Sequence, residues 1–367
     1  MTKIKEIIRS LEEIAPLSYQ EDYDNSGLIT GNAEAEVTGV VLSLDCLEAV
    51  VEEAIEKSCN VILCHHPIIF SGLKSLTGKN YVERTIIKAI KHDIAIIAWH
   101  TNLDNVIKGG VNHKIAEKLG LQNLKVLSPK SGTLLKLVTY VPSGHLDEVK
   151  GALFRAGAGE IGDYAECSFA TLGTGTFNPN ENSNPTIGEK GILKQVEESR
   201  LEVLVNKPLL NAVLSALKKA HTYEEVAYEV YAILNENQDV GSGAIGDLPN
   251  EVSKKDFLKL LKTQFGLNLV KYTNTNSETI KKVAVCGGSG SFLMRAAVAR
   301  KADAYVTADI KYHEFFDADN KLMLCDIGHY ESEIFTLELF YDVLSKKFSS
   351  FATLFTSIRT NPVNYYI

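Results

Sequence analysis

The sequence has few cysteines, and no two of them form a C-x-x-C pair. They are Cys46, Cys59, Cys64, Cys167, Cys286 and Cys325. Such a scattered set favours reduced thiols over a disulfide framework. The first residues, MTKIKEIIRSLEEIA, have the pattern of a charged amphipathic helix and lack the features of a signal sequence. Together these features predict a cytoplasmic protein.

Long apolar runs and an excess of positive charge are also missing. No stretch reaches the roughly 18 apolar residues that a membrane span needs, so we expect a soluble protein without a membrane partner. The net charge is -8, which argues against a chain that binds nucleic acid by charge alone, such as a ring around DNA. The net charge does not rule out a local basic patch.

What the sequence does contain is the composition of an ordinary globular protein. It has 367 residues, of which 45% are hydrophobic and 23% are charged. That length allows two or three domains with a substantial core.

Strand and helix patterns alternate in the first third of the chain. Short apolar strands are followed by segments with apolar residues at helical spacing. The predicted strands are 38–45, 60–64 and a third within 94–104, which leaves into a polar loop that contains Asp104. The predicted helices are 46–58, 80–93 and 109–120. This order predicts a largely parallel sheet that is covered on both faces.

The middle of the chain has a different order, strand-helix-strand-strand-helix-strand. That is the order of a ferredoxin-like α+β domain. Its predicted elements are 133–142, 145–157, 167–177, 201–207, 208–221 and 224–234, with a polar loop at 178–191. A Gly- and Asp-rich segment, 235–250, follows and is predicted to be a linker.

The last third returns to the α/β pattern. A strand-helix-strand unit between Lys281 and Asp309 matches in length the unit between Thr38 and His65. We therefore predict an α/β protein in which two related halves, 1–127 and 237–367, form one core that is interrupted by the insert 128–236.

Four segments place metal-ligand side chains where predicted strands end. They are CHHP (64–67), WHTNLD (99–104), TADIKYHE (307–314) and DIGHYESE (326–333). Open parallel sheets bind ligands beyond the carboxyl ends of their strands. These segments are therefore candidates for one shared site.

Adjacent histidines are the most unusual feature. His65 and His66 point in opposite directions if the strand continues, so one ion would hardly use both, whereas two ions could. Pro67 holds His66 in an extended conformation. The alternative is that each histidine is an ordinary hydrogen-bonded core residue.

Three further residues complete the candidate ligand set. A single helix is predicted for 330–348, and His329 and Glu333 are four residues apart across its first turn, so they share one face of it. Glu331 and Glu333 alternatively only complement the positive helix N-terminus. Asp104 has two oxygens with which to bridge two cations, and its alternative role is an Asx turn or a helix cap.

Five nitrogen and oxygen ligands are too many for one open catalytic ion and too few to saturate two. Two cations about 3.5 to 4 Å apart would leave positions for water, which is the arrangement of a hydrolase. Imidazole and carboxylate suit Zn, Mn, Fe or Co, and the sequence does not choose among them.

Other residues near these segments have open alternatives. His100 is a candidate catalytic proton carrier or outer partner of the ligands, or else a buried histidine bonded to backbone. His313, with Asp309 and Lys311, contacts substrate or lies in a solvated loop. The amides of the glycine loop 286–291 could cradle an anion, and His221 of the insert could be a ligand or an effector contact, but both are more simply turn residues. Cys64 and Cys325 are more simply packing residues.

Several motifs in one order resemble the Nif-three-like family, whose members are also called GTP cyclohydrolase I type 2 homologues. They are DNSGLITGN (24–32), CHHPIIF (64–70), HTNLDNVIKGGVN (100–112), TADIKYHEFFDA (307–318) and GHYESE (328–333). The insert, with 157–177 and 221–231, is similar to the PII-like insert of longer bacterial members.

The resemblance implies a dinuclear metal site, a ring-shaped homohexamer, and hydrolysis of GTP at C8 of its base with release of formate. Its metal ligands fall on His65, His66, Asp104, His329 and Glu333. The family's Thr-Gly-Asp turn is Thr307, Ala308 and Asp309 here. The first expectation is thus a metal-dependent hydrolase of a nucleotide or similar small molecule. The second is a metabolite-sensing regulatory protein without turnover.

Overall fold

The computed structural model describes residues 1–366 and divides into two compact units. One unit contains Met1–Pro129 and Asp239–Ile367, and the other contains Lys130–Gln238. The helices are at most 12 residues long, and within residues 1–366 none is long and apolar enough to cross a bilayer. The protein is a mixed α/β structure with three sheets.

The first sheet of the larger unit has the strand order β1-β4-β3-β2-β15. Its strands are β1 (Gly27–Thr30), β2 (Gly39–Ser43), β3 (Val61–Cys64), β4 (Ala95–Ala98) and β15 (Ala352–Phe355). All neighbours are parallel except β1 and β4, which are antiparallel. The predicted parallel character is confirmed for the three pairings β15–β2, β2–β3 and β3–β4, but not for the edge strand β1.

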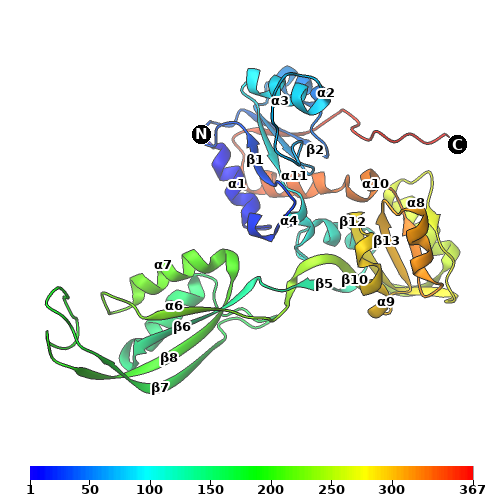
Figure 1. Ribbon diagram of the computed structural model, residues 1–367. Helices are drawn as coiled ribbons and strands as arrows, with labels where there is room; N and C mark the ends of the chain where they lie inside the picture. Colours follow the sequence, from blue (N-terminus) through cyan, green and yellow to red (C-terminus); the bar gives the residue numbers. More distant parts are fainter. Residues whose placement is uncertain (367) are drawn as a thin grey trace. The chain divides into compact units, whose positions relative to one another are not determined.

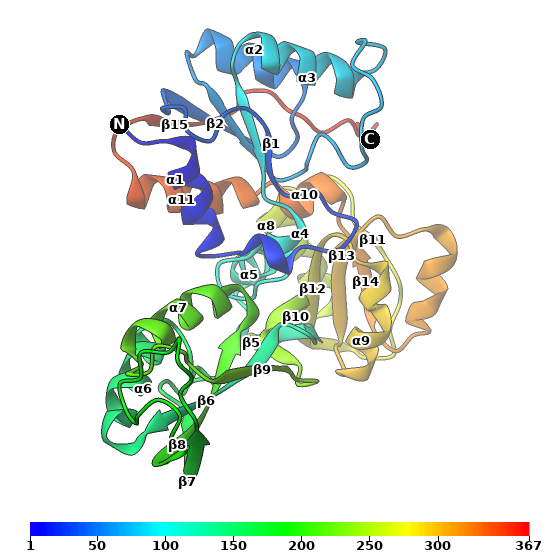
Figure 2. The same ribbon diagram turned by 60° about the vertical axis from the view of Figure 1, so that its left-hand side comes forward.

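Helices cover both faces of this sheet, which explains why β2, β3 and β4 are buried at every position. The helices α2 (Glu48–Glu56) and α3 (Tyr81–Lys91) pack on one face, and α1 (Ile4–Glu12) and α11 (Thr336–Lys347) lie on the other (Figures 1 and 2). Val41 and Ile62 face α2 and α3, whereas Leu42 and Leu63 belong to the opposite core. Alternating side chains thus fill two separate cores.

The second sheet has the order β11-β14-β13-β12-β10-β5. Its strands are β5 (Gln122–Lys130), β10 (Asn237–Ser253), β11 (Lys271–Tyr272), β12 (Thr279–Ser289), β13 (Ala304–Ala308) and β14 (Met323–Asp326). The strands β12, β13 and β14 are parallel. Around this sheet lie η1 (Leu17–Tyr19), α4 (Thr101–Asp104), α5 (Val111–Lys118), α8 (Lys254–Phe265), η4 (Ser291–Leu293), α9 (Met294–Ala299), η5 (Tyr312–Ala318) and α10 (His329–Glu333).

The prediction of a linker at 235–250 is wrong, because this segment forms most of β10. Its glycines are required by close backbone approach. A Cβ at Gly241 would lie 2.2 Å from the carbonyl oxygen of Ser128, and a Cβ at Gly246 would lie 2.7 Å from that of Gln122. A segment whose glycines permit tight strand packing has the same glycine content as a flexible loop, so composition alone does not distinguish the two.

The single helix predicted from Tyr330 to Phe348 is also interrupted. α10 ends at Glu333 and α11 begins at Thr336. Ile334 and Phe335 keep helical backbone angles, and the amides of Leu337 and Glu338 bond three residues back. No glycine or proline marks this tightened turn in the sequence.

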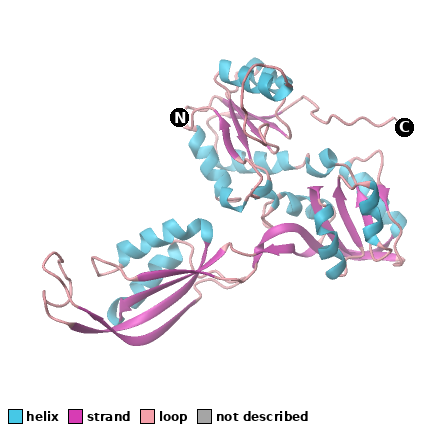
Figure 3. Ribbon diagram, viewed as in Figure 1, coloured by secondary structure: helices cyan, strands magenta, loops and turns pink. Residues whose placement is uncertain are grey.

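The smaller unit is an antiparallel sheet with two helices on one face (Figure 3). The strand order is β7-β8-β6-β9, with β6 (Leu134–Pro142), β7 (Ser168–Phe177), β8 (Lys194–Asn206) and β9 (Tyr228–Ala232). The helices are η2 (Ser143–His145), α6 (Leu146–Arg155), η3 (Lys207–Leu209) and α7 (Leu210–Ala220). Leu137, Leu153, Leu201 and Val213 are fully buried between sheet and helices.

Glu53 of α2 ties the segment after β15 to the first sheet. Its side chain is 5% exposed and accepts hydrogen bonds from Lys57, from the hydroxyl of Thr356, and from the amide and hydroxyl of Ser357. Burial alone would raise the pKa of this carboxyl, but the hydrogen bonds from Lys57 and Ser357 lower it to about 2. The ionised carboxylate therefore stabilises the fold.

We expect Glu53→Gln to lower the melting temperature by about 4 to 8 °C at pH 7. Because the folded pKa is depressed, the stabilisation is present above the unfolded pKa of about 4.5 and is lost as the pH falls towards 2. The difference from wild type should therefore shrink in calorimetry at acid pH. The control Glu52→Gln, at a side chain that is 56% exposed, should change little. An undiminished difference at pH 3 would contradict this account.

Candidate metal centre

His65 begins the site directly after β3. Its ring is fully buried, and Nδ1 lies 2.8 Å from the carbonyl oxygen of Trp99. Nδ1 must therefore carry the proton and donate it, which leaves Nε2 as a free lone pair. Nε2 lies 3.7 Å from Oδ1 of Asp104 and 3.8 Å from Oε1 of Glu333, both too far for a hydrogen bond.

His66 points to the other side of Glu333. Its Nδ1 lies 2.7 Å from Oδ1 of Asp45, and its Nε2 lies 2.9 Å from Oε2 of Glu333. Asp45 is held in turn by the hydroxyl of Thr360 at 2.6 Å. Burial lowers the pKa of His66, but the hydrogen bonds that its ring donates to Asp45 and Glu333 raise it to about 9.

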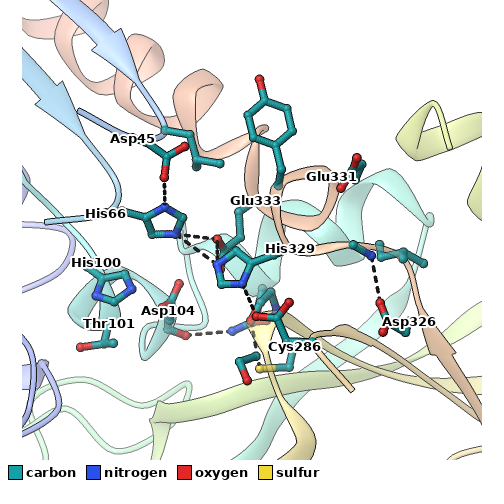
Figure 4. A pocket seen from close by; sticks show the side chains of 18 of the residues that line it. Asp45, His66, His100, Thr101, Asp104, Cys286, Asp326, His329, Glu331 and Glu333 are labelled. Atoms are coloured by element: carbon teal, nitrogen blue, oxygen red, sulfur yellow. Dashed lines mark hydrogen bonds and ion pairs between the residues drawn. The ribbon is translucent and has the colours of Figure 1, made fainter. Parts of the chain in front are cut away.

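His329 mirrors this arrangement from α10. Its Nδ1 lies 2.6 Å from Oδ2 of Asp309, and its Nε2 lies 3.0 Å from Oε2 of Glu333 (Figure 4). Burial lowers the pKa of His329, but bonding to Asp309 and Glu333 raises it to about 11. The Nε2 atoms of His66 and His329 are only 3.3 Å apart. Two imidazoles thus converge on one carboxylate oxygen.

Asp104 lies at the end of the short helix α4, so its predicted position in a loop is wrong. The four residues after His100 form one helical turn, which TNLD does not signal because it lacks a periodic apolar pattern. Burial and the charge of Glu333 raise the pKa of Asp104. The buried Glu333 shows the opposite shift: burial would raise its pKa, but hydrogen bonds from His329 and His66 lower it.

The five predicted ligands come together in two overlapping clusters. His66, His329 and Glu333 form one, and His65, Asp104 and Glu333 form the other; within each, the ligand atoms lie within 4.8 Å of one another. His65, His66 and His100 form a third such group. Glu333, 3% exposed, belongs to two of the three.

Two unpartnered atoms test whether these residues fit a cation. Nε2 of His65 and Oδ1 of Asp104 are buried without a hydrogen-bond partner within residues 1–366. A buried lone pair without a partner is costly, and a divalent cation between imidazole and carboxylates would satisfy both atoms. The donor set therefore fits one or more divalent metal ions.

A cavity of about 890 Å³ opens beside these clusters within the larger unit. His66, His100, Asp104, His329 and Glu333 form part of its wall. Aromatic side chains line it as well, namely Tyr23, Phe70, Phe292, Tyr330 and Tyr365. The candidate ligands thus face a space that is large enough for a small-molecule substrate.

Comparison with known proteins shows to which family this chain belongs. The family model Duf34/NIF3 (NGG1p interacting factor 3) matches residues 2–362. The chain belongs to the DUF34/NIF3 family. It is 40% identical over 364 residues to a Halalkalibacterium halodurans protein named "GTP cyclohydrolase 1 type 2 homolog", covering 98% of both chains, and 41% identical over 332 residues to a Bacillus subtilis protein of the same name, covering 90% and 89%.

Solved structures of this family have the same fold. The crystal structure of a Bacillus cereus protein related to NIF3 superposes with a TM-score of 0.86 at 37% identity, covering 100% of this chain and 99% of that one. A Staphylococcus aureus protein superposes with a TM-score of 0.76 at 31% identity, with the same coverage. The resemblance predicted from the motifs is confirmed.

His100 lies beside the clusters of this DUF34/NIF3 site. Its ring centroid is 5.2 Å from that of His65 and 5.5 Å from that of His66. Nδ1 lies 2.8 Å from Oδ1 of Asp24, so it is bonded to a carboxylate and not to backbone. Burial would raise the pKa of Asp24, but the hydrogen bonds from His100 and Thr101 hold it well below its usual range.

The glycine loop after β12 serves the site by packing closely. Gly288 has a φ of +59°, and a Cβ there would lie 2.4 Å from Oε1 of Glu333. Its amide donates to the hydroxyl of Ser332 at 3.0 Å. The loop therefore positions α10 against the sheet.

The remaining candidates lie elsewhere or have structural roles. His313 is exposed on η5 beside Tyr312 and Phe316, and within residues 1–366 it does not line the cavity. Cys64 and Cys325 are fully buried in apolar cores.

Sequence reasoning missed Asp24 and Asp45 as outer carboxylates of the site, and it named Asp309 only beside His313 as a substrate contact. Asp24, Asp45 and Asp309 each accept a hydrogen bond from one site histidine. Asp45 and Asp309 follow the carboxyl ends of β2 and β13. Their position at the end of a parallel strand is the sequence signal that could have identified them as partners of the site histidines.

Proposed function

We propose that this protein is a hydrolase that depends on two divalent cations, Zn, Mn, Fe or Co, and acts on a nucleotide or similar small molecule. The observation that carries the proposal is the position of Glu333 between two three-residue clusters that share its carboxylate. One oxygen faces His66 and His329, and the other faces His65. Two cations so held would lower the pKa of water and polarise a substrate oxygen.

His100 is the proposed proton carrier. The ionised Asp24 accepts a hydrogen bond from the Nδ1–H group of His100 and so fixes the ring. This leaves Nε2 to hold or deliver a proton in the cavity. Asp24 is itself fixed by the hydroxyls of Ser26 and Thr101 and by the amide of Thr101. This hydrogen-bonded support sets one tautomer of His100.

The substrate proposal rests on the cavity and on the relatives. The aromatic side chains Phe70 and Phe292 are 55% and 67% exposed along the cavity, where they suit a planar base. The name of the two similar proteins points to GTP as the substrate. In the proposed reaction, water opens the imidazole ring of the guanine base at C8 and formate is released on the way to dihydroneopterin triphosphate.

Formate release from GTP tests this function. Protein loaded separately with Zn, Mn, Fe or Co should release formate in at least one form, and His65→Ala should abolish that release. His92→Ala, at an exposed position after α3, is the matched control and should keep full activity. No formate from any of the four forms would contradict the cyclohydrolase assignment, and a panel of other nucleotides would then test hydrolysis in general.

Replacing Asp24 by asparagine tests the role of His100. The asparagine amide can donate to Nδ1 as well as accept from it, so the tautomer of His100 is no longer fixed. We therefore expect the turnover number to fall about 100-fold or more while the metal content stays unchanged. Unchanged turnover, or a parallel loss of metal, would show that the pair does not act in proton transfer.

The finer architecture is also proposed. We propose that the unit Lys130–Gln238 is a PII-like insert, because its strands and helices follow the order of a ferredoxin-like domain. The two sheets of the larger unit are proposed as related halves, since each has three adjacent parallel strands that lead towards the site. A homohexamer in the cytoplasm is the proposed state, and light scattering of the purified protein tests its mass.

A further inference from the structure

The smaller unit contains a cavity of its own, with a volume of about 700 Å³. Residues of β6, β7 and β8 line it from the sheet face that carries no helix, and Figure 3 shows both helices of this unit on the other face. Tyr140, Arg200 and Thr171 lie in register across β6, β8 and β7, and Glu198 lies opposite Gly173 two residues further along β8. Side chains two residues apart on a strand share a face, so Glu198 and Arg200 both project into this space.

A loop and a turn close the other side of the cavity. The loop 178–187 is held to the turn 222–225, because the hydroxyl of Thr186 donates to the carbonyl of Thr222 at 3.0 Å and the amide of Asn184 donates to Glu224 at 2.7 Å. His221 supports the turn: Nε2 donates to the carbonyl of Tyr140, and Nδ1 accepts from the amide of Tyr223. Both ring nitrogens of His221 are thus occupied by backbone.

Glu198 is the polar group that points to a ligand. It is 8% exposed, and within residues 1–366 its carboxylate has one hydrogen-bond partner, the hydroxyl of Tyr223 at 2.7 Å. Burial and this bond raise the pKa of Tyr223, which therefore stays a donor. Oε2 faces Gly175, where a Cβ would lie only 1.9 Å away. Within residues 1–366 this carboxylate has no positively charged partner, so a cationic group in the cavity would pair with it.

The charges of the wall define what kind of donor fits. Glu198, Glu224 and Glu225 face the cavity with Arg200 as the only cationic side chain among its described lining residues. Arg200 uses Nη1 to pair with Glu202 at 2.5 Å. Its other N–H groups remain for a carboxylate, because a guanidinium has five donors. The wall therefore suits a ligand with more positive than negative charge.

We propose that this cavity binds a basic amino acid, with an amino group on Glu198 and the α-carboxylate on Arg200. A simple anion would leave Glu198 unpaired. A nucleotide would bring several negative charges next to three carboxylates, which is unfavourable. The second cationic group of the ligand lies towards Glu224 and Glu225. The inference is independent of the proposed hydrolase activity, since every residue it uses belongs to the smaller unit.

Calorimetric titration and thermal shift of the full-length protein test the proposal. The probes are lysine, ornithine and arginine, with cadaverine as lysine without its carboxylate and 6-aminohexanoate as lysine without its α-amino group. At least one of the three amino acids should raise the melting temperature by about 3 °C or more at saturation. Both partial analogues should bind at least about tenfold more weakly than lysine.

Variants of the wall complete the test. Glu198→Gln should weaken binding at least about tenfold, and Gly175→Ala, which keeps the charge but displaces the carboxylate, should do the same. Glu197→Gln is the matched control, because this exposed neighbour lies on the opposite face of β8. Circular dichroism and an unchanged metal content show that the variants are folded.

The proposal is overturned if none of the three amino acids binds. It is also overturned if cadaverine binds as well as lysine, since carboxylate recognition would then be absent. Equal weakening by Glu197→Gln and Glu198→Gln would contradict it too, because the effect would then not belong to the cavity.

Discussion

Replacing Glu333 by glutamine should remove both cation sites at once. Its carboxylate lies 2.9 Å from Nε2 of His66, 3.0 Å from Nε2 of His329 and 3.8 Å from Nε2 of His65. A neutral amide provides one weak oxygen ligand where the carboxylate provides two charged ones, and its NH₂ group would face imidazole. We expect the metal content to fall from about two ions per chain to less than one.

Turnover of the substrate should fall with the metal. Changes to outer partners of metal ligands typically cost 10- to 100-fold, so loss of a shared ligand should cost at least about 100-fold. The matched control is Glu331→Gln, because Glu331 also lines the cavity from α10 but bonds to Asn361. Glu331→Gln should keep the full metal content. If Glu333→Gln retained two ions, the shared-ligand account would be wrong.

Metal affinity should depend steeply on pH. In the metal-free protein the pKa of His66 is raised to about 9 and that of His329 to about 11, so both rings are charged at neutral pH. A cation binds only neutral imidazole and must displace both protons. As the pH increases towards 9, the metal affinity of the cluster of His66, His329 and Glu333 should therefore rise about 100-fold with each pH unit.

The stability of the metal-free protein should change in the opposite direction. A raised folded pKa stabilises the fold below the unfolded value of about 6.5, and this contribution is lost as the pH rises through about 9 and then about 11. Metal should therefore stabilise the protein most at alkaline pH, by about 4 kcal/mol when it exceeds the dissociation constant 1,000-fold.

Titrations with and without a chelator between pH 6 and pH 9 measure both effects. Calorimetry in two buffers with different heats of ionisation counts the released protons, which should number about two at this cluster. Affinity that does not change with pH would contradict the protonated state of the two histidines.

The candidate ligands were predictable because each carries a local signal. His65 and His66 follow an apolar strand, and His329 and Glu333 have the spacing of one helical turn. Those signals reside in a few adjacent residues. The meeting of His66 with Glu333, 267 positions apart, was inferred only from the expectation that the ends of parallel strands converge.

Features that depend on tertiary packing were not predictable in the same way. Gly241 and Gly246 gave the composition of a linker, although they permit close contact between β10 and β5. The outer carboxylates Asp24 and Asp45 have no spacing that links them to a histidine, because their partners are 76 and 21 positions away. Their roles follow from distances in space.

Anomalous diffraction from crystals grown with the bound metal would test the central claim most directly. The account predicts two anomalous peaks in each chain, one contacted by His66, His329 and Glu333 and the other by His65, Asp104 and Glu333. A metal-loaded crystal with no peak between these side chains, or with Glu333 turned away from both histidine clusters, would contradict it.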